Sequence, residues 1–221
     1  MRYIIRKIRR AFTRLKTISL GQGEYFVNGV NYKIHSDDNS HAVRRYKNDP
    51  NHLRFEVNEG ECREKEFGLE RSELSGGEGQ FNHHEEINCS YEFRVISGTD
   101  LEGAKAVCGQ FHAGIGSPNL SIRIIGNDRL KVYLRTGDAK DYTQLVPYST
   151  TFEKDRWYKI NINVVFSSDP DGKVKIWIDD ELVVNLSNLV TGYTQSNSNY
   201  WKFGIYRSTS HQSTMITEFR Y

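Results

Sequence analysis

Residues 157–164 read Trp-Tyr-Lys-Ile-Asn-Ile-Asn-Val, and residues 173–178 read Lys-Val-Lys-Ile-Trp-Ile. Both segments alternate polar and apolar side chains, which is the period of two expected of a β-strand with one buried face. The pair Asp171-Gly172 between them is typical of a hairpin turn. Together they predict an antiparallel hairpin whose apolar face packs against a core.

The same alternation recurs along most of the chain after residue 23. Besides this hairpin, which spans 156–166 and 173–178, strands are expected at 24–35 (turning at Asn28-Gly29), 53–57, 69–74, 88–96, 105–112, 120–125, 129–135, 181–187, 200–206 and 214–220. No helix of more than two turns is expected after residue 20. A chain of 221 residues with so many short strands predicts one all-β sandwich domain, for which a jelly roll is the natural arrangement.

The first 23 residues form a distinct basic segment. They contain seven Lys and Arg and no acidic residue, whereas the other 198 residues hold 23 basic and 28 acidic residues, a net charge of −5. Apolar side chains recur at helical spacing, at Ile4, Ile5, Ile8, Ala11, Phe12, Leu15 and Ile18. We therefore expect residues 1–22 to be a basic amphipathic segment with a short helix, and residues 23–221 to be the β-domain. The apolar stripe would dock on the domain, belong to an upstream tail, or let residues 1–20 contact an anionic surface.

Several classes of protein are excluded by composition. The chain has no run of about 18 apolar residues, so no membrane span is expected. No continuous apolar stretch follows the N-terminal charges, so no secretory signal is recognisable. Cys62, Cys89 and Cys108 fit neither a disulfide framework nor a zinc site, and buried free thiols are expected. The acidic body argues against general polyanion binding, so nucleic acid is not an expected partner and any polyanion site must be local.

Three short stretches, far apart in the chain, carry most of the residues capable of chemistry. They are Arg-Ser-Glu-Leu at 71–74, Gln-Phe-His at 110–112 and Tyr-Trp-Lys-Phe-Gly-Ile-Tyr at 200–206. If these strands are neighbours, one face of the sheet presents Arg71, Glu73, Gln110, His112, Tyr200, Lys202 and Tyr206. The residues between them, Phe111, Trp201, Phe203 and Ile205, would point into the core.

These residue types suit the recognition of a carboxylate and the movement of a proton. A guanidinium such as that of Arg71 matches a carboxylate bidentately, and Glu73 would orient it. Gln110 can donate to the same carboxylate. His112 has an unperturbed pKa near 6.5 and suits a base, and the Tyr206 phenol, with a pKa of about 10, suits an acid, or a base where cations lower it. Taken singly, each residue also fits a structural role, such as a cross-strand salt bridge.

In this order and at this spacing, the three motifs resemble the strand motifs of the jelly-roll polysaccharide lyases, which include glucuronan, heparin and alginate lyases. The hairpin at 157–178 likewise resembles the back-sheet hairpin of concanavalin-like jelly rolls. The resemblance implies β-elimination on a uronic-acid polymer, which leaves a 4,5-unsaturated uronate end and needs no cofactor for the chemistry. Relatives sometimes carry a structural calcium ion, which the sequence does not establish. An anionic polysaccharide as partner, a monomer, and an extracellular or periplasmic location are expected on the same ground.

The resemblance also assigns roles to residues. Catalysis is expected of His112, Tyr206, Arg71 and Gln110, with no metal ligand among them. Substrate binding is expected of Glu73, Lys202, Tyr200 and a cationic, aromatic strip on the hairpin around residue 126, formed by Arg123, Lys131, Tyr133 and Arg135.

Several alternatives remain open from the sequence. The base is His112 in an anti elimination, or Tyr206 in a syn elimination. The stretch from Lys202 to Arg207 leans toward the glucuronan and heparin branch, because the alginate branch typically has Ala after the Lys. A non-catalytic carbohydrate-binding module on the same fold is the main rival to an enzyme. A hydrolase of this architecture would need a second carboxylate, and Glu73 has no evident partner.

Overall fold

The computed structural model describes residues 17–37, 39–61, 69–98, 105–208 and 213–221, and the regular structure in these ranges is entirely β. The strands are β1 (Thr17–Ser19), β2 (Glu24–Val27), β3 (Val30–Ser36), β4 (Val43–Tyr46), β5 (Asp49–Val57), β6 (Leu69–Ser75), β7 (Phe81–Asn82), β8 (Glu86–Val95), β9 (Lys105–His112), β10 (Leu120–Ile125), β11 (Arg129–Gly137), β12 (Tyr142–Thr151), β13 (Tyr158–Val165), β14 (Gly172–Ile178), β15 (Glu181–Leu189), β16 (Ser198–Ser208) and β17 (Met215–Arg220). No helix in these ranges is long and apolar enough to cross a bilayer.

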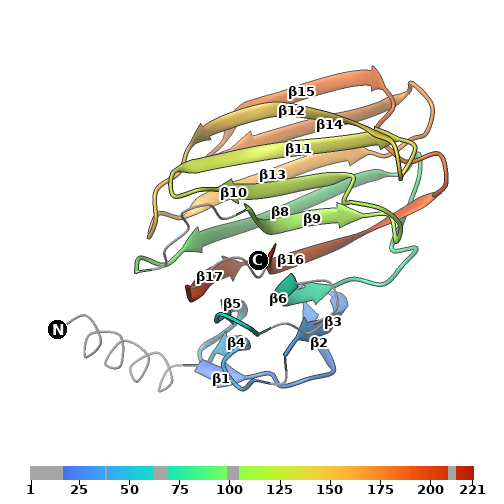
Figure 1. The fold of residues 1–221 in the computed structure, drawn as a ribbon. Coiled ribbons are helices and arrows are strands. Elements are labelled where there is room, and N and C mark those ends of the chain that lie inside the picture. Colours follow the sequence, from blue (N-terminus) through green and yellow to red (C-terminus); the bar gives the residue numbers. More distant parts are fainter. Residues whose placement is uncertain (1–16, 38, 62–68, 99–104, 209–212) are drawn as a thin grey trace.

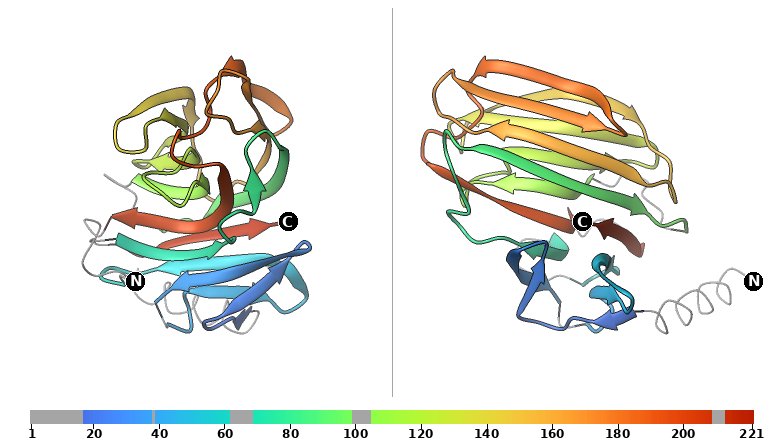
Figure 2. Two further views of the ribbon diagram at one scale, coloured as in Figure 1. Left: turned by 90° about the vertical axis from the view of Figure 1, so that its right-hand side faces the viewer. Right: turned by 180° about the vertical axis from the view of Figure 1, so that it is seen from behind.

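The strands form two antiparallel sheets that pack face to face (Figures 1 and 2). An eight-stranded sheet has the order β1-β4-β5-β17-β8-β13-β14-β15, and a nine-stranded sheet has the order β12-β11-β10-β9-β16-β6-β3-β2, with β7 paired to β16. The N-terminal strands, drawn in blue in Figure 1, form one flank of both sheets. This arrangement confirms the all-β jelly-roll sandwich expected from the sequence.

Every strand expected from the alternation is present, whereas four short or exposed strands were not expected. The opening hairpin is observed as β13 and β14, with Ile160 opposite Ile178 and Val164 opposite Val174. The unexpected strands are β1, β4, β7 and β12. Residues 1–16 of the expected N-terminal helix lie outside the described residues. Ile18, expected on that helix, instead lies in β1 and pairs with Arg45 of β4.

The core between the sheets is strongly aromatic. Phe111, Trp201, Phe203 and Ile205 are at most 2% exposed, as their alternation predicts. The ring centroids of Trp201 and Phe111 lie 4.7 Å apart, and Tyr91 of the other sheet lies 5.3 Å from Trp201. Such rings supply a large part of the hydrophobic stabilisation of a sandwich.

A buried ion pair ties β6 to β16 on the core side of the nine-stranded sheet. Arg207 Nε lies 2.6 Å from Glu70 Oε2, and both side chains are 0% exposed. Glu70 also accepts a hydrogen bond of 2.8 Å from the backbone N–H of Gly60. Arg207 therefore points away from the functional face, as expected from its place in the alternation.

We expect Glu70→Gln to lower the free energy of unfolding by about 3–5 kcal/mol, because it leaves the buried Arg207 cation without its counter-ion. Asp180→Asn is the matched control, since it removes the charge of an exposed pair with Lys159, suits the backbone φ of +69° at this position, and should cost at most about 1 kcal/mol. Urea unfolding of both variants measures the difference. Equal losses in the two variants would contradict the structural role of the buried pair.

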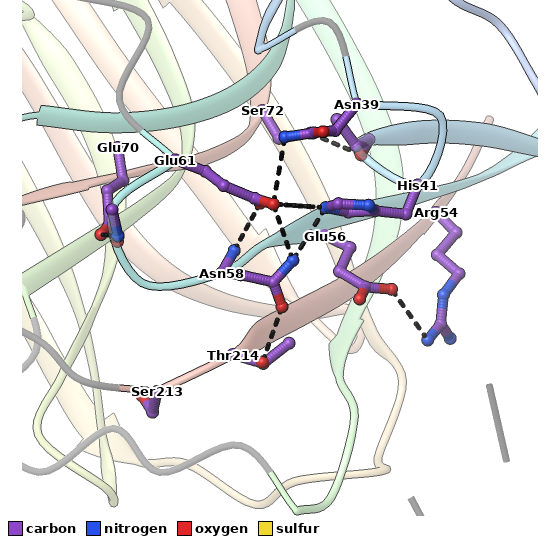
Figure 3. Close-up of polar contacts among 12 residues, drawn as sticks. Asn39, His41, Arg54, Glu56, Asn58, Glu61, Glu70, Ser72, Ser213 and Thr214 are labelled. Carbon is purple, nitrogen blue, oxygen red and sulfur yellow. Dashed lines mark hydrogen bonds and ion pairs between the residues drawn. The ribbon is translucent and has the colours of Figure 1, made fainter. Parts of the chain in front are cut away.

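A second polar network lies beside this pair and holds residues 58–61, directly after β5, in place (Figure 3). The carboxylate of Glu61 accepts hydrogen bonds from the Asn58 backbone N–H at 2.7 Å and from Asn39 Nδ2 at 3.1 Å. His41 Nε2 lies 2.8 Å from the same carboxylate. Burial alone would raise the pKa of Glu61, but the hydrogen bonds from His41 and Asn58 outweigh burial and hold that pKa below its usual value. The network joins this loop to β17, because Thr214, just before β17, donates to Asn58 Oδ1 at 2.8 Å.

Candidate active site

The three motifs lie on adjacent strands, in the order β9-β16-β6, near the middle of the nine-stranded sheet (Figure 1). Tyr200 is opposite His112 and Lys202 is opposite Gln110, while Tyr206 is opposite Arg71. Residues directly opposite each other in an antiparallel pair project from the same face. The register therefore brings all seven motif residues to the outer face of this sheet.

A β-bulge in β16 determines the position of Tyr206 on the sheet. The register with β9 shifts between Phe203 and Tyr206, so that Tyr206 pairs with Val107. Gly204, inside the bulge, has φ +131°, and a Cβ there would lie 2.3 Å from the Ser72 carbonyl oxygen. No other residue type fits this position without strain, which gives the glycine of the third motif a physical reason.

Glu73 is the centre of the charged cluster. Its carboxylate accepts a 2.6 Å hydrogen bond from Gln110 Nε2 and lies 3.1 Å from Lys202 Nζ and 3.4 Å from Arg71 Nε. Glu73 is only 1% exposed, so it lies beneath the surface that a polymer would touch. Glu73 was expected both to orient Arg71 and to bind substrate, and its buried position suits it to holding the other three side chains in place.

The cluster leaves hydrogen-bonding capacity on Gln110. Its amide nitrogen has two hydrogens, of which the bond to Glu73 uses one. Its Oε1 is buried and has no hydrogen-bond partner in the described part of the chain. A buried acceptor without a partner is costly, and donors on a bound ligand would satisfy it.

Tyr206 is surrounded by cations. The Arg71 guanidinium carbon lies 4.7 Å from the centroid of its ring, and Lys202 Nζ lies 6.0 Å from the same point. Arg123 of β10 is close enough to Tyr206 for a favourable electrostatic interaction. Positive charges favour the ionised form of a phenol, which is the form that accepts a proton.

His112 is neutral at physiological pH. Burial, followed by the charges of Lys202 and Arg71, lowers the pKa of His112 to about 4. This pKa is lower than the unperturbed value near 6.5 on which the expectation of His112 as a possible base rested. The Tyr200 ring packs beside the imidazole with a centroid distance of 5.6 Å. Tyr200 itself is half-buried at the edge of the cluster.

The cationic strip continues across β10 and β11 on the same face. Arg123 lies over the Tyr133 ring at 4.8 Å and donates a 2.9 Å hydrogen bond from Nε to Ser121 Oγ. Lys131, directly opposite Arg123, is half-buried. Burial and then the charge of Arg135 lower the pKa of Arg123 to about 10, so it remains charged at neutral pH. These strands thus extend the charged face away from the motif residues.

Two residues of this strip were missed from the sequence, because β12 was not expected. Tyr142 lies under the Arg135 guanidinium at 4.7 Å, and Gln144 Oε1 accepts a 2.9 Å hydrogen bond from Arg135 Nε. β12 is an edge strand that is exposed or half-buried along its whole length and contains Pro147. Proline is found in sheets mainly on edge strands, so Pro147 was the feature of the sequence from which this edge strand could have been predicted.

The described residues give no sign of a metal site. No group of three or more His, Cys, Asp or Glu side chains gathers in this part of the chain in a way that would hold a metal ion. Asp171, in the turn before β14, pairs with His84 at 3.2 Å. Cys89 and Cys108 are free, while Cys62 lies outside the described residues.

Comparisons with known proteins identify a family and a shared fold. A family model described as polysaccharide lyase matches residues 23–217. Among curated protein sequences, none matches the chain. The fold is similar to that of the endo-β-1,4-glucuronan lyase from the fungus Trichoderma reesei, with 19% sequence identity, a TM-score of 0.70, and coverage of 90% of this chain and 91% of that chain.

Two further solved structures share the fold. The alginate lyase A1-II', a member of polysaccharide lyase family 7, has 12% identity and a TM-score of 0.63, covering 92% of this chain and 90% of that one. The catalytic domain of a GH131 β-glucanase from Podospora anserina also has 12% identity, with a TM-score of 0.60 and coverage of 86% and 81%. The sandwich therefore occurs in both lyases and hydrolases.

Proposed function

Because the chain belongs to the polysaccharide lyase family, we propose that it cleaves a uronic-acid polymer by β-elimination on the outer face of the nine-stranded sheet. The observation that carries this proposal is the cluster held by buried Glu73. That cluster presents Arg71, Gln110 and Lys202 beside the Tyr206 phenol. A carboxylate binder and a proton-transfer group therefore lie side by side.

The chemistry of a uronate explains why both are needed. The hydrogen at C5 is barely acidic while the neighbouring carboxylate is ionised. Hydrogen bonds and charge from Arg71, Gln110 and His112 would neutralise that carboxylate and stabilise the negative charge that develops when the proton leaves. The electron pair of the C5–H bond then forms the C4–C5 double bond, the C4–O4 bond breaks, and O4 receives a proton. The Tyr206 hydroxyl is suited to these proton transfers.

A polymer of glucuronate is the favoured substrate. The stretch from Lys202 to Arg207 leans toward the glucuronan and heparin branch of these enzymes. The Trichoderma reesei structure, with its TM-score of 0.70, is that of a glucuronan lyase. Arg123, Lys131 and Arg135 would bind carboxylates of neighbouring sugars along the same face. An alginate-like polymer of mannuronate is the second candidate.

Two rival functions fit the site less well. A hydrolase needs two carboxyl groups flanking the scissile bond, but Glu73 is buried and engaged by two cations and an amide. A binding module would use the cationic and aromatic strip, but it would not require the phenol of Tyr206 to be placed under a guanidinium.

Incubating the protein with a panel of uronic polymers tests the proposal. We expect ultraviolet absorbance from a C4–C5 double bond to grow with glucuronan, and shorter chains to appear with it. Binding of these polymers without any unsaturated ends would favour the non-catalytic module. Shortened chains with saturated ends would favour a hydrolase.

A further inference from the structure

The residues after β9 determine which nitrogen of His112 carries its proton. The backbone N–H of Gly114 donates a 2.9 Å hydrogen bond to His112 Nδ1. A backbone N–H can only donate, so Nδ1 must be the acceptor and the neutral ring carries its hydrogen on Nε2. Gly114 has φ +80°, a conformation that glycine adopts without strain. The turn that brings this N–H back onto the imidazole is therefore stable for the sequence present.

This tautomer makes His112 a donor and not a base. Neither ring nitrogen is free to accept a proton. Nδ1 accepts the hydrogen bond from Gly114, and Nε2 is bonded to a hydrogen. The ring is neutral at physiological pH, with Lys202 and Arg71 as its charged neighbours. From Nε2 it can donate a hydrogen bond to a substrate carboxylate, but it has no site to receive the C5 proton.

Proton abstraction then falls to Tyr206. Its ring lies under the Arg71 guanidinium and near Lys202 Nζ, which favour a phenolate. In the reaction the phenolate takes the C5 proton and becomes a phenol, and the electron pair of the C5–H bond stays on the sugar to form the C4–C5 double bond. As the C4–O4 bond breaks, the phenol returns that proton to O4 and the phenolate is restored. A single group can serve both steps only if the C5 hydrogen and O4 lie on the same face of the sugar.

We infer that the Gly114 N–H, by holding His112 as a donor, restricts this enzyme to uronates whose C5 hydrogen and O4 lie on the same face of the ring. D-Glucuronate and D-mannuronate have this configuration. L-Guluronate, L-iduronate and D-galacturonate have the C5 hydrogen and O4 on opposite faces and need a second group as base. This inference rests on the proposed function and makes Gly114 a positioning residue for the reaction.

A pair of stereochemically matched polymers tests the restriction. We expect the wild-type protein to form unsaturated ends on polyglucuronate or polymannuronate at least about a hundredfold faster than on polyguluronate, since a missing base costs about 10²–10⁴ in rate. Comparable rates on polyguluronate would overturn the inference while leaving the lyase function intact. Failure on every uronic polymer would instead overturn the proposed function.

Two substitutions of His112 separate a donor from a base. His112→Gln keeps an N–H donor near the position of Nε2 but cannot take up a proton, and we expect kcat to fall by about tenfold. His112→Leu removes the donor and should lose about 10²–10³ in kcat, the usual effect of removing one preorganised donor. If His112 were the base, both variants would lose activity equally.

Nitrogen NMR of the labelled imidazole gives a readout that does not depend on activity. At pH 7 we expect the His112 resonances, assigned by their loss in His112→Gln, to show a protonated Nε2 and an unprotonated Nδ1. On acidification the ring should titrate with a midpoint near 4, because burial and the charges of Lys202 and Arg71 disfavour the cation. A predominant Nδ1–H tautomer would overturn the inference even for a protein that is an active lyase.

Discussion

Tyr206→Phe should lower kcat by about a thousandfold or more while polymer affinity changes by less than about threefold. The substitution removes one oxygen and keeps the ring that lies 4.7 Å beneath the Arg71 guanidinium carbon. Packing and stacking should therefore survive, whereas the group proposed to take the C5 proton and to protonate O4 is lost. Initial rates of unsaturated-end formation measure the first quantity, and calorimetric titration with the polymer measures the second.

Tyr133→Phe is the matched control for that variant. Its ring lies under Arg123 at 4.8 Å in the same manner, but on β11, two strands from the β9 motif. It should keep wild-type kcat. A Tyr206→Phe protein as active as wild type would show that proton transfer belongs to another group, even if the protein proves to be a lyase.

Arg71→Ala should lower kcat by about 10²–10³, with a much smaller change in affinity. The carboxylate that Arg71 is proposed to neutralise would carry most of its additional charge in the transition state, so the lost interaction would be one that strengthens during the reaction. Lys202 and Gln110 still engage Glu73 in this variant, so the cluster should remain folded. Circular dichroism and thermal unfolding check that point.

Arg123→Ala provides the contrast on the neighbouring strand β10. Arg123 would bind a carboxylate away from the bond that breaks, so its loss should raise KM and leave kcat nearly unchanged, as loss of uniform binding does. Should Arg71→Ala instead raise KM alone, the two arginines would have the same role. Arg71 would then not be the group that neutralises the reacting carboxylate.

The face of the sheet was predictable from the sequence because side-chain direction in a strand has a period of two. The alternation around Phe111 and Trp201 placed Gln110, His112, Tyr200 and Lys202 on the opposite side of their strands, as observed. The adjacency of the three strands was not given by alternation. It came from the resemblance of the motifs to those of known lyases.

How deeply each of these side chains is buried could not be predicted from the alternation. Alternation identifies the face on which Glu73 lies, but its 1% exposure results from the three side chains that close over it from β6, β9 and β16. The state of His112 likewise depends on a backbone N–H two residues later and on charges from two other strands. Edge strand β12 has no buried face and therefore no alternation to detect.

The position of β17 has a consequence for how this protein is made. β17 lies in the interior of the eight-stranded sheet, between β5 and β8. Until residues 215–220 have left the ribosome, β5 and β8 have no partner on that side, and the ring of Phe219 is missing from beneath Phe203. The growing chain must therefore hold long strands with open edges and an incomplete core, a state prone to aggregation. Folding of the sandwich therefore requires residues 215–220, and their deletion should leave β5 and β8 unpaired on that side and the core without Phe219.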